Sequence, residues 1–190
     1  MKLEDIVFEG FGGVLCVEAG GPTPGIGCAG RGIISAFEKL AELEAFETYK
    51  PDIVIYDVLG DVVCGGFAMP IRGGYAREVF IVSSGEMMAL YAANNIAQAI
   101  KNFGRRGYAR LKGIILNAKN IENEQELVAK AAAEIGTEVV QYVPRSGDIQ
   151  IAENQGGTVS EFVKDSPMVQ VYNEPVSYTH LRAHETLANL

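Results

Sequence analysis

The sequence predicts an α/β protein with a doubly wound, mainly parallel β-sheet that carries helices on both faces. Two observations predict this fold class. Short runs rich in β-branched residues alternate along the chain with segments of helical periodicity. The run at 52–58 is continuously apolar, as expected for a strand that is covered on both faces. The chain has 190 residues, 48% of them hydrophobic, which suits one domain with a real core.

The first half of the chain is expected to contain two strands with a helix between them. The strands are predicted at 13–19 (GVLCVEA) and at 52–58 (DIVIYDV), where apolar and β-branched residues follow one another. The helix is predicted at 30–46 from apolar residues that recur at helical spacing. These residues are Ile34, Phe37, Leu40 and Ala41.

The second half repeats the alternation more regularly. Strands are predicted at 78–84, 111–118 and 137–145, and they are separated by helices at 85–103 and 123–136. The second of these helices is expected to stop at its final glycine. Strands that alternate with helices form βαβ units, so the sheet is expected to be parallel.

The acidic composition excludes two classes of partner. The chain carries 24 acidic and 16 basic residues, a net charge of −8, and no basic run, so neither nucleic acid nor an anionic membrane is expected to bind. No apolar run approaches the roughly 20 residues that span a bilayer, and the first ten residues do not resemble a signal peptide. The odd number of cysteines, three, argues against a disulfide framework. We therefore expect a cytoplasmic protein.

Two of the three cysteines lie in glycine-rich stretches. Cys28 lies in GPTPGIGCAGRG (21–32), and Cys64 lies in DVVCGGFAMP (61–70). Glycine lets backbone N–H groups approach a ligand closely, and N–H groups that bond to sulfur tune iron–sulfur clusters. Cys16 differs, because it has apolar neighbours on a predicted strand, and we expect it to be a small buried hydrophobe.

Cys28 and Cys64 are therefore candidate ligands of an iron–sulfur cluster. A [4Fe–4S] cluster usually needs four thiolates, whereas one chain offers only these two loop cysteines. A two-fold homodimer would resolve the shortage, because each subunit would give the same two cysteines to one cluster on the axis. The competing interpretation is a catalytic cysteine, which needs a nearby base, and no histidine precedes His180.

A second group of polar residues is typical of nucleotide-binding sheets. Asp57 lies at the end of a predicted strand and opens a D-x-x-G turn, and Asp61 follows this turn. Strand-terminal aspartates hold the water shell of Mg²⁺ in P-loop ATPases, and such turns can sense a γ-phosphate. Asn117 lies at a carboxyl strand end, where ligands bind in doubly wound sheets, and its amide can pair with adenine. The alternatives are an ordinary strand-ending aspartate and a turn-forming asparagine.

Three stretches together closely resemble the nitrogenase iron protein family: CVEAGGPTPGIGCAGRGI, YDVLGDVVCGGFAMPIR and SSGEMMALYAANNI. The resemblance extends without apparent gaps from about Glu4 to Tyr172. The arginine in GCAGRG favours this branch over the chlorophyll-pathway reductases, whose corresponding loop lacks it. The resemblance implies a P-loop NTPase fold and a homodimeric ATPase bridged by one [4Fe–4S] cluster. It also implies MgATP, a low-potential ferredoxin or flavodoxin as electron donor, and a catalytic metalloprotein such as dinitrogenase as acceptor.

The resemblance assigns roles to individual residues. Cys28 and Cys64 match the cluster ligands. Asp57 matches the Mg²⁺-linked carboxylate, and Asp61 matches the nucleotide-switch carboxylate. At the nucleoside the matching residues are Asn117, Gln150 and Glu153, and beside the docking face they are Arg31 and Arg72. Arg31 also matches an arginine that accepts ADP-ribose in some members. Only six residues separate Asp57 from Cys64, so a movement at the phosphate could reach the cluster through one short segment.

Some features of the family pattern are absent. The sequence contains no G-x-x-x-x-G-K-[ST] phosphate loop, and the strand before that loop and the early switch aspartate are also missing. We therefore expect 1–172 to be a partial domain, a fragment of a longer protein that is inactive by itself. Residues 173–190 depart from the pattern and are expected to form an atypical tail, either unstructured or artefactual.

Two alternative functions remain open, one suggested by residues near the cysteines and the other by the predicted sheet. Gly73, Gly74 and Tyr75 stand where nitrogenase members usually have charged and polar residues, and Thr23 replaces a usual acidic residue. Both changes are compatible with a nitrogenase-like reductase that serves a tetrapyrrole or another cofactor precursor. A non-redox P-loop ATPase of the partitioning type would share the sheet, but it would have no use for the two cysteine loops.

Overall fold

A computed structural model describes residues 1–18, 29–60, 69–72, 75–104 and 109–180. The chain divides into two compact units, Met1–Ala76 and Arg77–Leu190, and each is described by itself below. In the described part of the chain, no helix combines the length and the apolar composition that crossing a membrane requires.

The second unit is built on a parallel sheet. Its strands are β3 (Glu78–Ser83), β4 (Arg110–Asn117) and β5 (Val139–Val143), hydrogen-bonded in the order β3-β4-β5. Helix α4 (Met87–Gly104) connects β3 to β4, and α5 (Glu124–Ile135) connects β4 to β5. These elements confirm the predicted α/β fold with a parallel sheet, since all three strands and both helices lie close to their expected positions.

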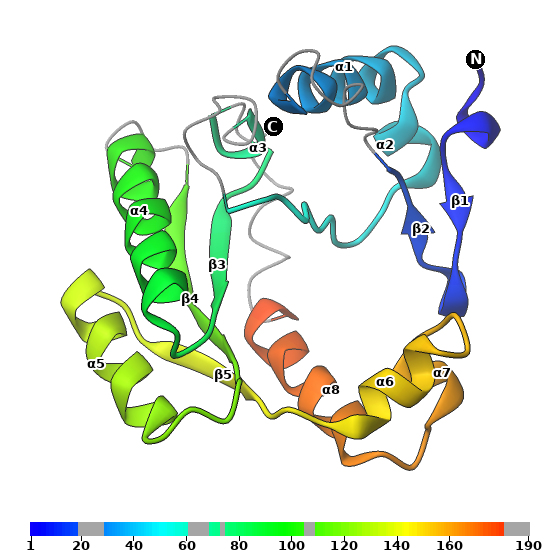
Figure 1. Cartoon of the computed structure of the whole chain (residues 1–190). Coiled ribbons are helices and arrows are strands. Elements are labelled where there is room, and N and C mark those ends of the chain that lie inside the picture. Colours follow the sequence, from blue (N-terminus) through cyan, green and yellow to red (C-terminus); the bar gives the residue numbers. More distant parts are fainter. Residues whose placement is uncertain (19–28, 61–68, 73–74, 105–108, 181–190) are drawn as a thin grey trace. The chain divides into compact units, whose positions relative to one another are not determined.

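Helices cover both faces of this sheet. Figure 1 shows α4 and α5 on one face and α8 (Pro167–His180) on the other. Two crossovers that step across a sheet in the same direction place their helices on the same face, because such crossovers share one hand. The buried core residues on α4, β4 and α5 are Ala93, Ala97, Ile100, Ile114, Leu116, Val128, Ala132 and Ile135.

A second cluster lies against the other face. It consists of Val143, Ala152 on α6 (Gly147–Glu153), Val159 on α7 (Val159–Phe162) and Met168 on α8. Ile115, whose neighbours in β4 are buried among the first set, packs against this cluster. This alternation follows from the two-residue period of a strand. Helix α8 continues to His180, so the first residues of the segment expected to be an atypical tail are helical, and 181–190 lie outside the described residues.

In its described residues, the first unit contains an antiparallel hairpin, three α-helices and two short 3-10 helices, Leu3–Asp5 and Phe11–Gly13. The hairpin consists of β1 (Phe8–Glu9) and β2 (Leu15–Cys16), and the first helix is α1 (Ala29–Glu42). The strand predicted at 13–19 is thus reduced to two residues. Cys16 is exposed, so the prediction that it is buried was wrong. All four residues of β1 and β2 are exposed, and an apolar sequence neighbourhood does not bury a side chain without packing partners.

The helix predicted at 30–46 is divided into two. Helix α1 ends at Glu42, and α2 (Ala45–Tyr49) begins after Glu44, whose φ of 53° is left-handed. A left-handed residue cannot continue a right-handed helix, so the chain changes direction there. The third helix of this unit, α3, spans Met69–Arg72.

The apolar run at 52–58 is not a strand, which corrects the prediction made for it. It has no hydrogen-bonded partner strand in the described residues, and Ile55 is 86% exposed. An apolar strand becomes buried only when ladders form on its edges and helices cover its faces. Since neither condition is met here, Ile53, Val54 and Val58 are exposed as well.

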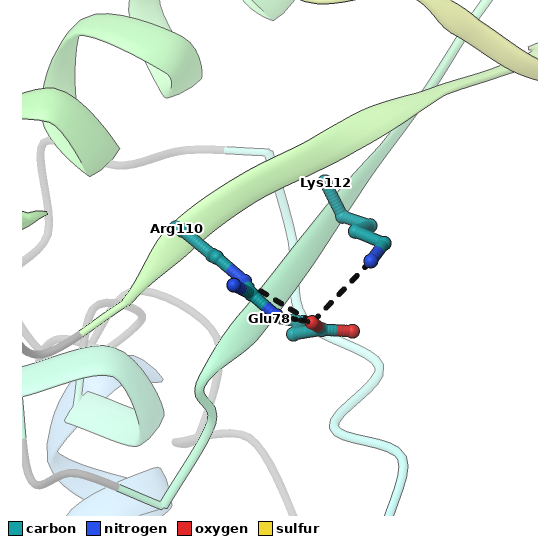
Figure 2. A network of polar contacts seen from close by, with 3 residues as sticks. All are labelled: Glu78, Arg110 and Lys112. Carbon is teal, nitrogen blue, oxygen red and sulfur yellow. Dashed lines mark hydrogen bonds and ion pairs between the residues drawn. The ribbon is translucent and has the colours of Figure 1, made fainter. Parts of the chain in front are cut away.

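A small ionic network joins β3 and β4 at their amino ends. Glu78 Oε1 accepts hydrogen bonds from Arg110, at 3.1 Å from Nε and also from Nη2, and lies 3.5 Å from Lys112 Nζ (Figure 2). Arg110 and Lys112 are two residues apart on β4 and therefore share a face. Burial raises the pKa of Glu78, but the Arg110 hydrogen bonds and the Lys112 charge together outweigh burial, so the net pKa is lowered.

We predict that Glu78→Gln lowers stability near neutral pH and that this loss shrinks in acid. The folded-state pKa of Glu78 lies below its ordinary value of 4.5. Its carboxylate therefore stabilises the fold above that pH, and the contribution disappears as the pH falls through the folded pKa. Since the Arg110 side chain is 55% exposed, we expect at most about 1 kcal/mol.

Urea unfolding of wild type and Glu78→Gln between about pH 7 and about pH 3 measures this difference in the free energy of unfolding. Glu122→Gln serves as the control, because Glu122 is exposed and has no ion-pair partner within the described ranges. A difference between wild type and Glu78→Gln that is the same at both ends of the pH range would contradict the prediction.

Candidate functional site

The carboxyl ends of β3, β4 and β5 form one edge of the sheet. Parallel register aligns Ser83 with Leu116 and Asn117 with Val143, so the three strands end at nearly the same level. Asn117 is exposed at the end of the central strand. Its side-chain amide has no hydrogen-bond partner among the residues that the structure describes. This arrangement leaves one free amide group at the sheet edge where ligands bind in doubly wound folds.

Glu124 joins the loops that follow β3 and β4. Its Oε1 accepts hydrogen bonds from the backbone N–H of Gly85 at 2.9 Å and of Lys119 at 3.1 Å. Its Oε2 accepts from the backbone N–H of Lys119 at 3.0 Å and of Ile121 at 3.2 Å. Glu124 is 6% exposed; its bond to Gly85 is buried, and its bonds to Lys119 and Ile121 are partly buried. The carboxylate therefore connects the loop that follows β3 to the loop that follows β4. Gly85 and Glu124 are 39 positions apart in the sequence.

The ionised form of Glu124 is favoured although the side chain is buried. Burial raises the pKa of this carboxyl, but hydrogen bonds from the backbone of Gly85, Lys119, Ile121 and Asn120 outweigh burial and lower it overall. The sequence analysis did not single out Glu124. The available signal was an acidic residue in the first turn of a helix, where it meets the positive end of the helix dipole, and that signal does not reveal the contact with Gly85.

Gln150 and Glu153 lie together on α6, the helix that follows β5. Ser146 caps this helix, since its Oγ accepts a hydrogen bond from the backbone N–H of Asp148 at 3.2 Å. Gln150 Nε2 donates to Glu153 Oε2 at 3.4 Å and to Asn154 Oδ1 at 3.2 Å. Both predicted nucleoside residues are exposed, one helical turn apart. They are thus available to a ligand from the same side of α6.

An aromatic cluster organises the first unit. The ring of Phe37, on α1, lies 5.3 Å from the ring of Tyr56 and 4.6 Å from the ring of Tyr75 (centroid distances). Phe37 is only 7% exposed. Burial raises the pKa of Tyr56, and the nearby Tyr75 raises it further. Since Tyr56 immediately precedes Asp57, the cluster attaches the segment that carries this exposed aspartate to α1.

The predicted cluster ligands lie outside the described residues, but the elements next to them are described. Cys28, Cys64 and Asp61 all fall in the undescribed ranges. Helix α1 begins immediately after Cys28, and α3 begins five residues after Cys64. Two further predicted site residues, Arg31 and Arg72, belong to α1 and α3, although their side chains are outside the described part.

Tyr75 has an internal packing role. Its ring contacts Phe37, and the residue is 43% exposed, so only part of its surface faces solvent. In the sequence, Tyr75 is one of three residues that stand where nitrogenase members usually have charged and polar residues. The contact with Phe37 supplies a physical reason for an aromatic residue at this position, because aromatic pairs stabilise a core beyond the area they bury.

Known proteins match this chain over nearly its whole length. The family described as "4Fe-4S iron sulfur cluster binding proteins, NifH/frxC family" matches residues 1–184. The chain is 53% identical over 174 residues to a nitrogenase iron protein of Methanospirillum hungatei JF-1, an alignment that covers 90% of this chain and 61% of that protein. It is 49% identical over 174 residues to a nitrogenase iron protein of Methanococcus voltae, covering 92% of this chain and 63% of that protein.

The chain thus spans about three-fifths of the length of these relatives. The family match includes both cysteine stretches, the segment around Asp57, the Asn117 edge and α6. The parallel α/β sheet agrees with the P-loop NTPase fold of the family. Sequence and fold together lead to one conclusion: this chain belongs to the NifH/frxC family of 4Fe-4S iron–sulfur cluster binding proteins.

Proposed function

We propose that this chain is part of an ATP-dependent iron–sulfur reductase, which passes electrons from a low-potential ferredoxin or flavodoxin to the catalytic metalloprotein of a nitrogenase. The observation that carries the proposal is the pair of glycine-flanked cysteines, Cys28 and Cys64, inside a chain that a 4Fe-4S-binding family matches over 1–184. The similarity to two nitrogenase iron proteins at 53% and 49% identity supports the nitrogenase assignment over other reductases.

The thiol groups present fit a cluster shared between two subunits. Each chain offers Cys28 and Cys64 in loops rich in glycine, and a two-fold homodimer offers four such thiolates. A [4Fe–4S] cluster, when bound, stores and releases single electrons. The protein's part is to hold the two loops at a constant spacing and to direct backbone N–H groups toward the sulfur atoms. The aromatic cluster of Phe37, Tyr56 and Tyr75 supports this role, because it packs the helix that follows Cys28 against residues on either side of Cys64 in the sequence.

Nucleotide binding is assigned to two groups of residues. Asp57 and Asp61 would act at the Mg²⁺-bound phosphates, and only six residues lie between Asp57 and Cys64. Asn117, Gln150 and Glu153 would contact the nucleoside, as their exposed positions at the sheet edge and on α6 allow. These 190 residues contain no G-x-x-x-x-G-K-[ST] motif, so we infer that they do not hydrolyse MgATP by themselves.

Docking of the metalloprotein is assigned to the surface around the cysteine loops. Arg31 and Arg72 belong to the two helices that follow these loops, α1 and α3. Arginine suits this task, because its planar guanidinium binds carboxylates in bidentate fashion. In this proposal Arg31 is also the residue that would accept ADP-ribose.

We predict that the cysteines of the glycine-rich stretches, and not Cys16, determine iron binding. Anaerobic reconstitution with iron and sulfide should give about four irons per dimer in wild type, and clearly fewer in Cys28→Ala or Cys64→Ala. Cys16→Ala is the matched control, because it removes an exposed thiol on β2 and should leave the iron content unchanged. Elemental iron analysis together with the mass of the complex in solution gives both numbers.

Two outcomes would count against this proposal. Wild-type protein that takes up no iron would favour a non-redox ATPase of the same fold. Equal loss of iron in all three cysteine variants would mean that thiols bind iron unselectively.

We further predict that Phe37 controls how firmly iron is retained. Phe37→Ala should lose iron to a chelator several-fold faster than wild type, because α1 would lose its packing against Tyr56 and Tyr75. Phe37→Leu keeps most of the volume and should show a smaller increase. Phe11→Ala is the control, since Phe11 is 52% exposed in the same unit. Equal chelation rates in wild type and Phe37→Ala, both folded by circular dichroism, would contradict the prediction.

A further inference from the structure

The bonds of Glu124 are unusual because they all come from backbone N–H groups. Among the described residues, this carboxylate forms no ion pair, and its negative charge faces the amides of Gly85, Lys119 and Ile121. An amide in place of the carboxylate would direct an NH₂ donor at one of these N–H donors. Shape alone therefore cannot replace the charge at this position.

The position of Glu124 leaves no room for a side chain at Gly85. A Cβ atom built on Gly85 would lie 2.7 Å from Glu124 Cγ and 3.2 Å from Glu124 Oε1. Contacts of the first length do not occur in folded proteins, so any side chain at Gly85 must displace Glu124. The loop after β3 thus packs closely against Glu124, and the hydrogen bond from Gly85 links it to that side chain.

Asn117 lies directly beside this connection. The next residue, Ala118, is buried and donates its backbone N–H to the carbonyl of Val143 at 2.9 Å. The residue after that, Lys119, donates its backbone N–H to both carboxylate oxygens of Glu124. The backbone that follows Asn117 is thus held by β5 on one side and by Glu124 on the other, while the Asn117 side chain itself is exposed.

We propose that Glu124 is a positioning residue of the nucleoside site: by clamping the loops at Gly85 and Lys119, it orients the Asn117 amide toward an adenine base. This inference rests on the proposed function, because it takes Asn117 as a contact of the nucleoside. It adds a residue that touches no ligand and acts through the backbone of two loops.

Two pairs of variants of the complete chain test the clamp. Glu124→Gln removes the charge at constant shape, and Glu126→Gln makes the same change at an exposed position on the same helix. Gly85→Ala displaces Glu124 sterically, and Gly147→Ala is its control, because a Cβ there meets nothing within 4 Å. The first readout is amide hydrogen exchange at Lys119 and Ile121, and the second is the NMR response of the Asn117 side-chain amide to ADP.

We expect exchange at Lys119 and Ile121 to rise roughly tenfold in Glu124→Gln, and also in Gly85→Ala, whose substitution lies in the other loop. The two control variants should exchange like wild type. In Glu124→Gln the affinity for ADP should fall roughly tenfold. Gly85→Ala in a Glu124→Ala background should have little additional effect, because the displaced side chain is already gone.

The outcomes separate this inference from the proposed function. Unchanged exchange at Lys119 and Ile121 in Gly85→Ala would overturn the clamp, whatever ADP does. Faster exchange with unchanged ADP affinity would show that the clamp is structural only, and it would overturn the positioning role. A wild-type chain whose Asn117 amide does not respond to ADP would overturn the nucleoside assignment, and the positioning role with it.

Discussion

The second unit depends on the parallel pairing of its central strand. Strand β4 is hydrogen-bonded to β3 on one side and to β5 on the other, and its Ile114 and Leu116 are almost completely buried. The pairing with β5 needs a glycine at Gly113, because a Cβ there would lie 2.3 Å from Val140 Cγ1. Since parallel strands end at a common edge, this one ladder determines where Asn117, the loop to Glu124 and the start of α6 lie.

Two carboxylates at opposite ends of this ladder are kept ionised by different means. Glu78, at the amino ends, is partly exposed and is paired with the cations Arg110 and Lys112. Glu124, at the carboxyl ends, is buried and is bonded by backbone amides. Salt screens the first arrangement more strongly than the second, because Glu124 is mostly buried and its hydrogen-bond partners carry no net charge. The end proposed to bind nucleotide is thus the end that is held by backbone N–H donors instead of charged side chains.

The sequence predicted the elements whose burial partners are close in the chain, and it missed those whose partners are distant. Strands β3, β4 and β5 and their helices were found, because each apolar run packs on its neighbours in a βαβ series. The run at 52–58 is equally apolar but has no partner strand in the described residues, and its Ile53, Val54, Ile55 and Val58 are exposed. Cys16 is exposed as well, although its neighbours in the sequence are apolar. Glu124 escaped notice because its contact with Gly85 spans 39 positions. The roles of Cys28, Cys64 and Asp61 stay predictions from sequence.

Tyr75 shows why a position that is close to Cys64 in the sequence cannot be assigned to the proposed docking surface alone. It lies three residues after Arg72, yet its ring packs on Phe37, a buried residue of the helix that begins next to Cys28. The 43% of Tyr75 that is exposed belongs to the surface, and the rest belongs to the aromatic cluster. A substitution there changes the packing of α1 and the outer surface at once. If the proposed cluster and docking roles hold, a substitution of Tyr75 therefore changes the surroundings of the cluster and the docking surface together.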